Sequence, residues 1–118
     1  MSKILIIDDS RTSRRILRNI LEEAGHEVIA EATDGQDGIN KYRELRPDIV
    51  TLDITMPVMD GLTALKGIRE VDEKARVIMV TAAGQQSKMI EAIKQGASEF
   101  VTKPFEKEEI IKMVNKVV

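Results

Sequence analysis

The 118-residue sequence has no cysteine and no tryptophan, and it has only one histidine, one tyrosine and two phenylalanines. The absence of cysteine excludes disulfides, zinc–thiolate sites, iron–sulfur clusters and a cysteine nucleophile. Because His26 is the single histidine, sites built from several histidines are excluded too. Apolar runs reach only four residues, whereas a membrane helix needs roughly 20. A strand-like run already follows residue 3, so we expect no signal peptide, no membrane partner and a cytoplasmic location.

The charges are nearly balanced, with 18 basic and 20 acidic residues and a formal net charge of −2. Such a chain lacks the bulk positive field of a general nucleic-acid binder, so we expect no nucleic-acid partner. Its length is typical of one domain. We therefore expect residues 1–118 to form a single domain.

Two hydrophobic periods alternate along the chain. Short apolar runs predict strands at residues 4–7, 28–30, 49–52, 77–80 and 100–101. Apolar positions at helical spacing predict helices around 16–24, 39–45, 62–68, 89–93 and 110–117, with Asp60 as a plausible N-cap of the third. The first run is apolar at every position and the third is interrupted only by Thr51, which is typical of parallel strands buried on both faces.

Five βα units in succession predict an α/β fold. Right-handed crossovers leave few topologies for such a chain. A closed barrel of this kind needs about eight strands. The sequence therefore predicts a flavodoxin-like (βα)5 fold, a doubly wound parallel five-stranded sheet in the order 2-1-3-4-5.

Polar residues stand where the predicted strands end: Asp8 and Asp9, then Asp53, Thr81 and Lys103. Each has an ordinary structural explanation when taken alone. Asp9 suits a helix N-cap, Asp53 a turn, Thr81 the end of a strand, and Lys103 the solvated surface. In the predicted strand order, however, these strand ends lie side by side at the edge where such sheets bind ligands.

Three clustered carboxylates need a compensating cation. Two unit charges about 4 Å apart repel by roughly 4 kcal/mol at an effective dielectric constant of about 20. Oxygen ligands with room for water and phosphate suit Mg²⁺, and Lys103 supplies a point charge for an anion. The set predicts metal-assisted phosphoryl transfer with a carboxylate as nucleophile.

Four motifs carry a resemblance that covers essentially the whole chain. They are IIDDS at residues 6–10, LDITMP at 52–57 with DG at 60–61, VTA at 80–82, and VTKPF at 101–105. In this order and at this spacing, the sequence resembles the receiver domain of bacterial response regulators. The resemblance implies that Asp53 accepts a phosphoryl group from the histidine of a sensor kinase.

The resemblance also implies roles for the neighbouring residues. Thr81 is the hydroxyl that hydrogen-bonds a phosphoryl oxygen, Lys103 pairs with another, and the Lys103–Pro104 bond is cis. The metal is Mg²⁺, with Mn²⁺ as an alternative. Its expected ligands are the carboxylates of Asp8, Asp9 and Asp53 and the backbone carbonyl of Thr55.

The resemblance places the switch at Thr81 and Phe100. Thr81 moves toward the phosphoryl group, and the aromatic residue on the fifth strand turns inward. Phe100 has no hydroxyl, so it would act by packing alone, and plain core filler is the competing interpretation. Thr55 and Ala83 occupy the positions that tune the phosphoryl lifetime. Readout is expected on residues 86–94, Phe100 and residues 107–114.

Taken together, we expect a phosphorylation-operated binding module and not an enzyme that turns over an external metabolite. The expected partners are a sensor histidine kinase, a downstream output protein and a phosphatase, and the unphosphorylated chain is expected to be monomeric. The leading output is the flagellar motor switch of a chemotaxis pathway. The alternatives are a single-domain phosphorelay intermediate and the receiver fragment of a larger regulator.

Three other functional classes have less support. A phosphatase of the haloacid-dehalogenase class needs two aspartates separated by one residue, but Ser10 occupies the second place and Asp8 would have to be the nucleophile. A flavodoxin-like electron carrier needs a phosphate loop after the first strand, which is missing. Nucleotide-binding enzymes carry GxxxxGK[ST] or GxGxxG, and neither occurs.

Overall fold

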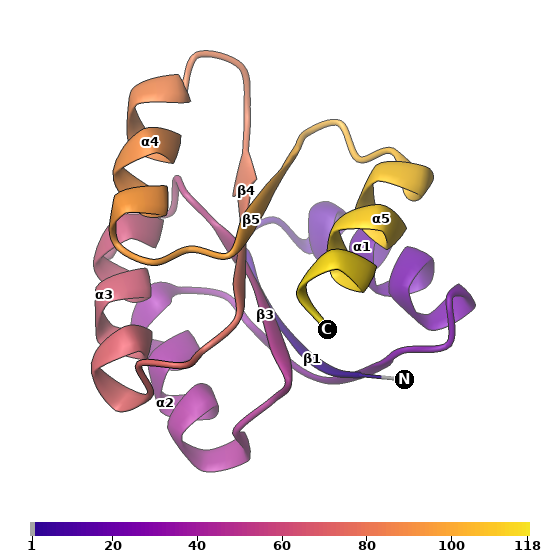
Figure 1. The fold of residues 1–118 in the computed structure, drawn as a ribbon, viewed down its shortest axis with the longest axis horizontal. Coiled ribbons are helices and arrows are strands. Elements are labelled where there is room, and N and C mark those ends of the chain that lie inside the picture. The colour runs from indigo at the N-terminus through magenta and orange to yellow at the C-terminus, as the bar shows by residue number, and fades with distance from the viewer. Residues whose placement is uncertain (1) are drawn as a thin grey trace.

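The structure, a computed structural model, describes residues 2–118 as strictly alternating strands and helices (Figure 1). The strands are β1 (Lys3–Ile7), β2 (Glu27–Ala32), β3 (Ile49–Asp53), β4 (Val77–Thr81) and β5 (Glu99–Thr102). The helices are α1 (Arg11–Glu23), α2 (Gly35–Leu45), α3 (Gly61–Val71), α4 (Gln86–Lys94) and α5 (Lys107–Val117). Every predicted element is present, and the strands extend one to three residues beyond their apolar runs.

All four strand pairs are parallel, and the sheet order is β2-β1-β3-β4-β5. This confirms the predicted flavodoxin-like topology. The order brings the carboxyl ends of β1, β3 and β4 together at one edge of the sheet. Any residue that follows one of these strands is therefore close to residues that follow the others.

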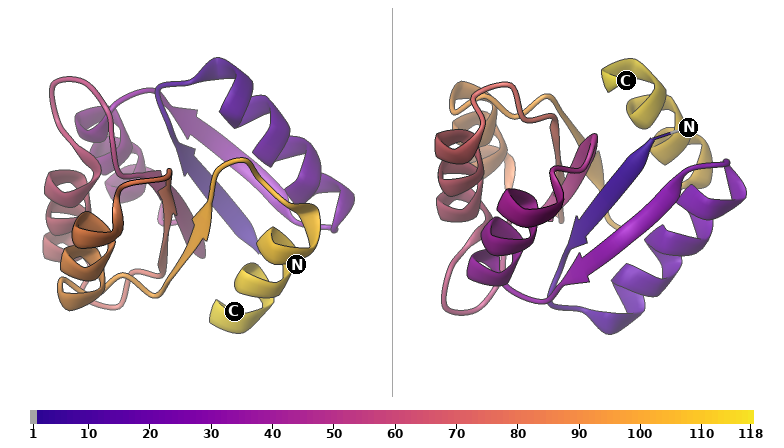
Figure 2. Two further views of the ribbon diagram at one scale, coloured as in Figure 1. Left: turned by 90° about the horizontal axis from the view of Figure 1, so that it is seen from above. Right: turned by 90° about the horizontal axis from the view of Figure 1, so that it is seen from below.

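Helices cover both faces of the sheet, with α1 and α5 on one side and α2, α3 and α4 on the other (Figures 1 and 2). β1 shows how its sequence produces this arrangement. Ile4 and Ile6 pack into the core beneath α1 and α5, whereas Leu5 and Ile7 pack into the core on the other face. All four are fully buried, because successive side chains of a strand point to opposite faces. None of the helices in residues 2–118 has the length and apolar character needed to cross a bilayer.

Side-chain caps set where three of the helices begin. Asp60 accepts the Thr63 N–H at 2.9 Å, as predicted, and Asp34 caps α2 in the same way. The structural explanation of Asp9 as the N-cap of α1 is wrong. Ser10 is the N-cap and accepts the Ser13 N–H at 3.2 Å. The Asp9 carboxylate therefore does not cap α1.

Gly61 allows the start of α3 to lie directly against the end of β3. Its N–H donates to the Ile54 carbonyl at 2.6 Å. A Cβ at this position would lie 2.2 Å from the carbonyl oxygen of Asp53 and 2.6 Å from the Cα of Ile54. Only glycine permits this approach, which holds the end of β3 in place and with it the backbone of Asp53.

Candidate functional site

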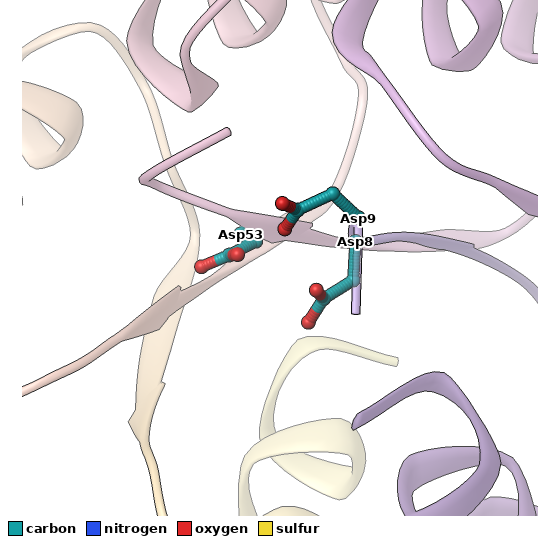
Figure 3. A group of neighbouring side chains, drawn as sticks. All are labelled: Asp8, Asp9 and Asp53. Carbon is teal, nitrogen blue, oxygen red and sulfur yellow. The ribbon is translucent and has the colours of Figure 1, made fainter. Parts of the chain in front are cut away.

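Three carboxylates meet at the carboxyl ends of β1 and β3 (Figure 3). Asp8 and Asp9 follow β1 directly, and Asp53 is the last residue of β3. Each offers one oxygen, and these oxygens lie within 4.8 Å of one another. Asp8 and Asp53 are buried and Asp9 is exposed, so the cluster opens to solvent on the Asp9 side.

Lys103 brings one positive charge to this cluster. Its Nζ lies 3.1 Å from Oδ2 of Asp8 and 3.6 Å from Oδ2 of Asp53. It follows β5, and the Lys103–Pro104 peptide bond is cis, as the resemblance implies. One ammonium group cannot neutralise three carboxylates, so the cluster keeps an excess of negative charge.

Asp8 shows that the donor set fits a cation. Its Oδ1 accepts the Ser10 N–H at 2.8 Å. Its Oδ2 is buried and has no aligned hydrogen-bond donor among the described residues, although the Lys103 ammonium lies close by. Buried polar atoms are normally satisfied, and a set made only of oxygen ligands matches the preference of Mg²⁺. The residues present therefore fit a divalent cation.

The environment of Asp53 perturbs its ionisation. Burial, and next the nearby Asp8 charge, raise the pKa of Asp53 to about 6. Lys103 and the backbone N–H of Thr55 act to lower this pKa, and Asp9 acts to raise it. The carboxylate of Asp53 is thus ionised at neutral pH, but at a free-energy cost that a cation would relieve.

The Thr81 side chain does not face the carboxylates in this structure. Its Oγ1 donates to the Val101 carbonyl on β5 at 3.4 Å. Beside it lies a hollow of ≈ 370 Å³, whose lining includes Thr81, Met89 and Phe100. Phe100 is half-buried and packs against the core beneath α2, α3 and α4. The ring is thus both a core residue and part of the wall of this hollow.

Two exposed loops flank the opening of the site. Thr55 lies in the loop after β3, and Ala83 lies in the loop between β4 and α4. Gln85 connects these loops: its Nε2 donates to Oγ1 of Thr55, and its Oε1 accepts the Ala82 N–H at 2.6 Å. The sequence alone does not point to Gln85. No spacing signal marks a glutamine there, because its contacts depend on how two distant loops meet.

Comparisons with known proteins agree with this geometry. A family model described as "Response regulator receiver domain" matches residues 4–115. The chain is 48% identical over 115 residues to a Thermotoga maritima protein named "Chemotaxis protein CheY", and the match covers 98% of this chain and 96% of that protein. A Bacillus subtilis protein of the same name is also 48% identical, over 116 residues, with 98% and 97% covered.

Solved structures give the same result. The crystal structure of a CheX-CheY-BeF3-Mg+2 complex from Borrelia burgdorferi contains a chain that superposes with a TM-score of 0.93 at 39% identity. That match covers 98% of this chain and 87% of the other.

Proposed function

The chain belongs to the response-regulator receiver domain family, and from this premise we propose that residues 1–118 form one receiver domain whose Asp53 accepts a phosphoryl group from a sensor histidine kinase. One observation carries the proposal. The buried carboxylate of Asp53 lies within reach of two further carboxylates and of the Lys103 ammonium, at the ligand-binding edge of the sheet.

The proposed transfer is a nucleophilic substitution at phosphorus. A carboxylate oxygen of Asp53 forms a bond to the phosphorus of the phosphohistidine. The P–N bond breaks, and its electron pair leaves with the imidazole nitrogen of the kinase. Asp53 becomes an acyl phosphate, which water later hydrolyses to restore the carboxylate. A nucleophile whose pKa is about 6 is ionised at neutral pH, as this step requires.

The surrounding charges would position and neutralise the phosphoryl group. We assign a Mg²⁺ ion, with Mn²⁺ as an alternative, to the Asp8, Asp9 and Asp53 carboxylates and the Thr55 carbonyl. Such a cation supplies charge neutralisation for the phosphoryl oxygens and the carboxylates. The Lys103 ammonium, 3.6 Å from Asp53, would bind a phosphoryl oxygen.

We further propose that phosphorylation redirects Thr81. Its hydroxyl would leave the Val101 carbonyl and donate to a phosphoryl oxygen, and Phe100 would then turn into the hollow beside it. What supports this is the 3.4 Å contact of Thr81 with Val101 and the ≈ 370 Å³ of space that Thr81 and Phe100 line. The phosphoryl lifetime would depend on Thr55 and Ala83, which lie in the flanking loops.

The output is proposed to be a binding event on the surface of α4, β5 and α5. Ile90 and Ile93 of α4 are 54% and 45% exposed, so this surface offers apolar contact.

Because the relatives at 48% identity are named chemotaxis proteins, we propose the flagellar motor switch as the output partner. A phosphorelay intermediate and the receiver of a larger regulator are the alternatives. The Borrelia burgdorferi structure holds its CheY in a complex with a second protein, CheX, and for this chain we propose an auxiliary phosphatase as a further partner. The proposed state before phosphorylation is a cytoplasmic monomer.

The proposal is tested by intact-protein mass spectrometry after incubation with acetyl phosphate. Wild type and Asp53→Asn are compared with Mg²⁺ and with EDTA. We expect one phosphoryl adduct, which requires both Mg²⁺ and Asp53. An equal adduct on Asp53→Asn would refute Asp53 as the acceptor, and an adduct on Asp53→Asn that Asp8→Asn abolishes would favour the aspartate-nucleophile phosphatase class instead.

A further inference from the structure

The Gln85 side chain ties the two loops at the mouth of the site together. Its Oε1 accepts the Ala82 N–H at 2.6 Å, and its Nε2 donates to Oγ1 of Thr55. Ala82 follows Thr81, and Thr55 lies two residues after Asp53. A single amide group thus spans from the end of β4 to the loop that follows β3.

The Gln85 side chain does not serve as a helix cap, although Gln85 stands at the start of α4. Gln85 occupies the N-cap position of α4, yet its side chain makes no capping hydrogen bond to that helix. In α1, α2 and α3 the cap residue accepts an N–H from its own helix. The Gln85 side chain instead turns back toward the site. Gly84, at φ +85°, provides the backbone reversal just before it.

The Ala82 N–H is a donor that an anion on Asp53 could use. Asp53 pairs with Val80 in the sheet, and the Ile54 N–H donates to the Val80 carbonyl at 3.1 Å. Ala82 therefore projects just past the strand end that borders Asp53. In this structure its N–H is already occupied by the Gln85 amide oxygen. A single N–H donates one good hydrogen bond, so a phosphoryl oxygen and Gln85 exclude each other there.

Building on the proposed phosphorylation of Asp53, we propose that Gln85 is a clasp that competes with the phosphoryl group for the Ala82 N–H. When the phosphoryl group takes this donor, the Gln85 amide is displaced and its hydrogen bond to Thr55 breaks. The loop between β4 and α4 then loses its tether. Gln85 is thus a positioning residue, through which phosphorylation of Asp53 changes how the amino end of α4 is held.

Competition by Gln85 and a purely structural role for Gln85 predict different effects of its removal on anion binding. If Gln85 only stabilised the loop, its removal would leave anion binding unchanged or weaken it. If it competes, its removal makes the binding of a phosphoryl mimic tighter. A net hydrogen bond of ordinary strength corresponds to an effect of roughly two- to tenfold in the dissociation constant.

The experiment titrates beryllofluoride, in the presence of Mg²⁺, onto wild type, Gln85→Ala and Gln86→Ala. Binding is followed by the backbone amide resonances of Ala82 and its neighbours. Gln86 is a matched control, because it is adjacent, exposed and without a side-chain hydrogen bond to the residues that the structure describes. We expect a two- to tenfold tighter dissociation constant for Gln85→Ala only. In the ligand-free proteins, the Ala82 amide resonance should move in Gln85→Ala, which removes its acceptor, and not in Gln86→Ala.

A double-mutant cycle that combines Gln85→Ala with Thr55→Val adds a second measurement of beryllofluoride affinity. Valine keeps the branched shape and removes the oxygen that holds Nε2. The effect of Gln85→Ala is therefore expected to be smaller in the Thr55→Val background. Unchanged or weaker beryllofluoride binding by Gln85→Ala, or an equal gain in Gln86→Ala, overturns the clasp and leaves the proposed function intact. Absence of beryllofluoride binding by wild type overturns the proposed function and the clasp with it.

Discussion

Replacing Asp53 with asparagine is expected to stabilise the metal-free protein. The asparagine side chain has nearly the same shape as that of Asp53 but carries no charge into the cluster with Asp8 and Asp9. Asp53 is only 6% exposed, so solvent screens its repulsion from its neighbours weakly. The negative charge that Asp53 needs as a phosphoryl acceptor therefore lowers the free energy of unfolding when no cation is bound.

The magnitude follows from the pKa of Asp53, which is raised from 3.8 to about 6. Between these two values the folded protein binds more protons than the unfolded chain. Its free energy of unfolding thus falls as the pH rises through this window, and the full cost is present above about pH 6. The shift corresponds to about 3 kcal/mol at most. Since a buried asparagine amide keeps part of the desolvation cost, we expect a gain of roughly 1–3 kcal/mol.

The assay is urea unfolding in EDTA, followed by far-ultraviolet circular dichroism, because the chain has no tryptophan and a single tyrosine. Wild type and Asp53→Asn are compared at several pH values from 4.5 to 7.5. Glu73→Gln serves as a control, since it makes the same change in charge at an exposed position shortly before the amino end of β4. The stability gap should be large at pH 7.5 and small at pH 4.5. If Asp53→Asn is less stable than wild type at pH 7.5, or if the stability gap does not depend on pH, the Asp53 charge does not destabilise the metal-free fold.

The remaining predictions concern the metal, two backbone positions and the lifetime of the acyl phosphate. Saturating Mg²⁺ should raise the unfolding free energy of wild type, because the folded protein binds the ion and the unfolded chain does not. Since Asp53→Asn lacks one of the three carboxylates, the stability gap between the two proteins should narrow or reverse. Equal stabilisation of both proteins in urea titrations would contradict this. Gly61→Ala should lose roughly 3 kcal/mol or more in the same assay, since the added Cβ would lie 2.2 Å from the carbonyl oxygen of Asp53; a loss below about 1 kcal/mol would show that α3 can shift freely. Val58→Gly should gain roughly 0.5–1 kcal/mol, because Val58 has φ 70° and a fully exposed side chain, and a less stable variant would show that this backbone is not strained. Thr55→Ala should change the first-order rate of phosphoryl loss, measured by intact mass after the donor is removed, and an unchanged rate would remove Thr55 from control of the lifetime.

The topology was predictable because the physical signals in this sequence are local and consistent. Ile4 to Ile7 form an unbroken apolar run, which a strand with helices on both faces buries completely. Five strand-like runs that alternate with helices leave few right-handed topologies. The residues at the strand ends come together in the predicted order 2-1-3-4-5. The meeting of the Asp8, Asp9 and Asp53 carboxylates at one edge of the sheet could therefore be predicted from the sequence.

The features that escaped prediction depend on choices between nearly equal local options or on distant contacts. Asp9 and Ser10 are both favoured N-caps, and only the backbone direction after β1 decides for Ser10. The Thr81 hydroxyl could face the carboxylates or β5, and its contact with the Val101 carbonyl selects β5. The bridge from Gln85 to Thr55 joins residues 30 positions apart, and no periodic pattern encodes it.

The most direct test of the central claim is to identify the residue that carries the phosphoryl group. Borohydride reduces an acyl phosphate to the alcohol, so a phosphorylated aspartate becomes homoserine and can be located by peptide mass spectrometry. After treatment with acetyl phosphate and Mg²⁺ followed by borohydride, the account predicts homoserine at position 53, with Asp8 and Asp9 unchanged. Homoserine at position 8 or 9, or a phosphoryl adduct that leaves residue 53 as aspartate, would contradict it.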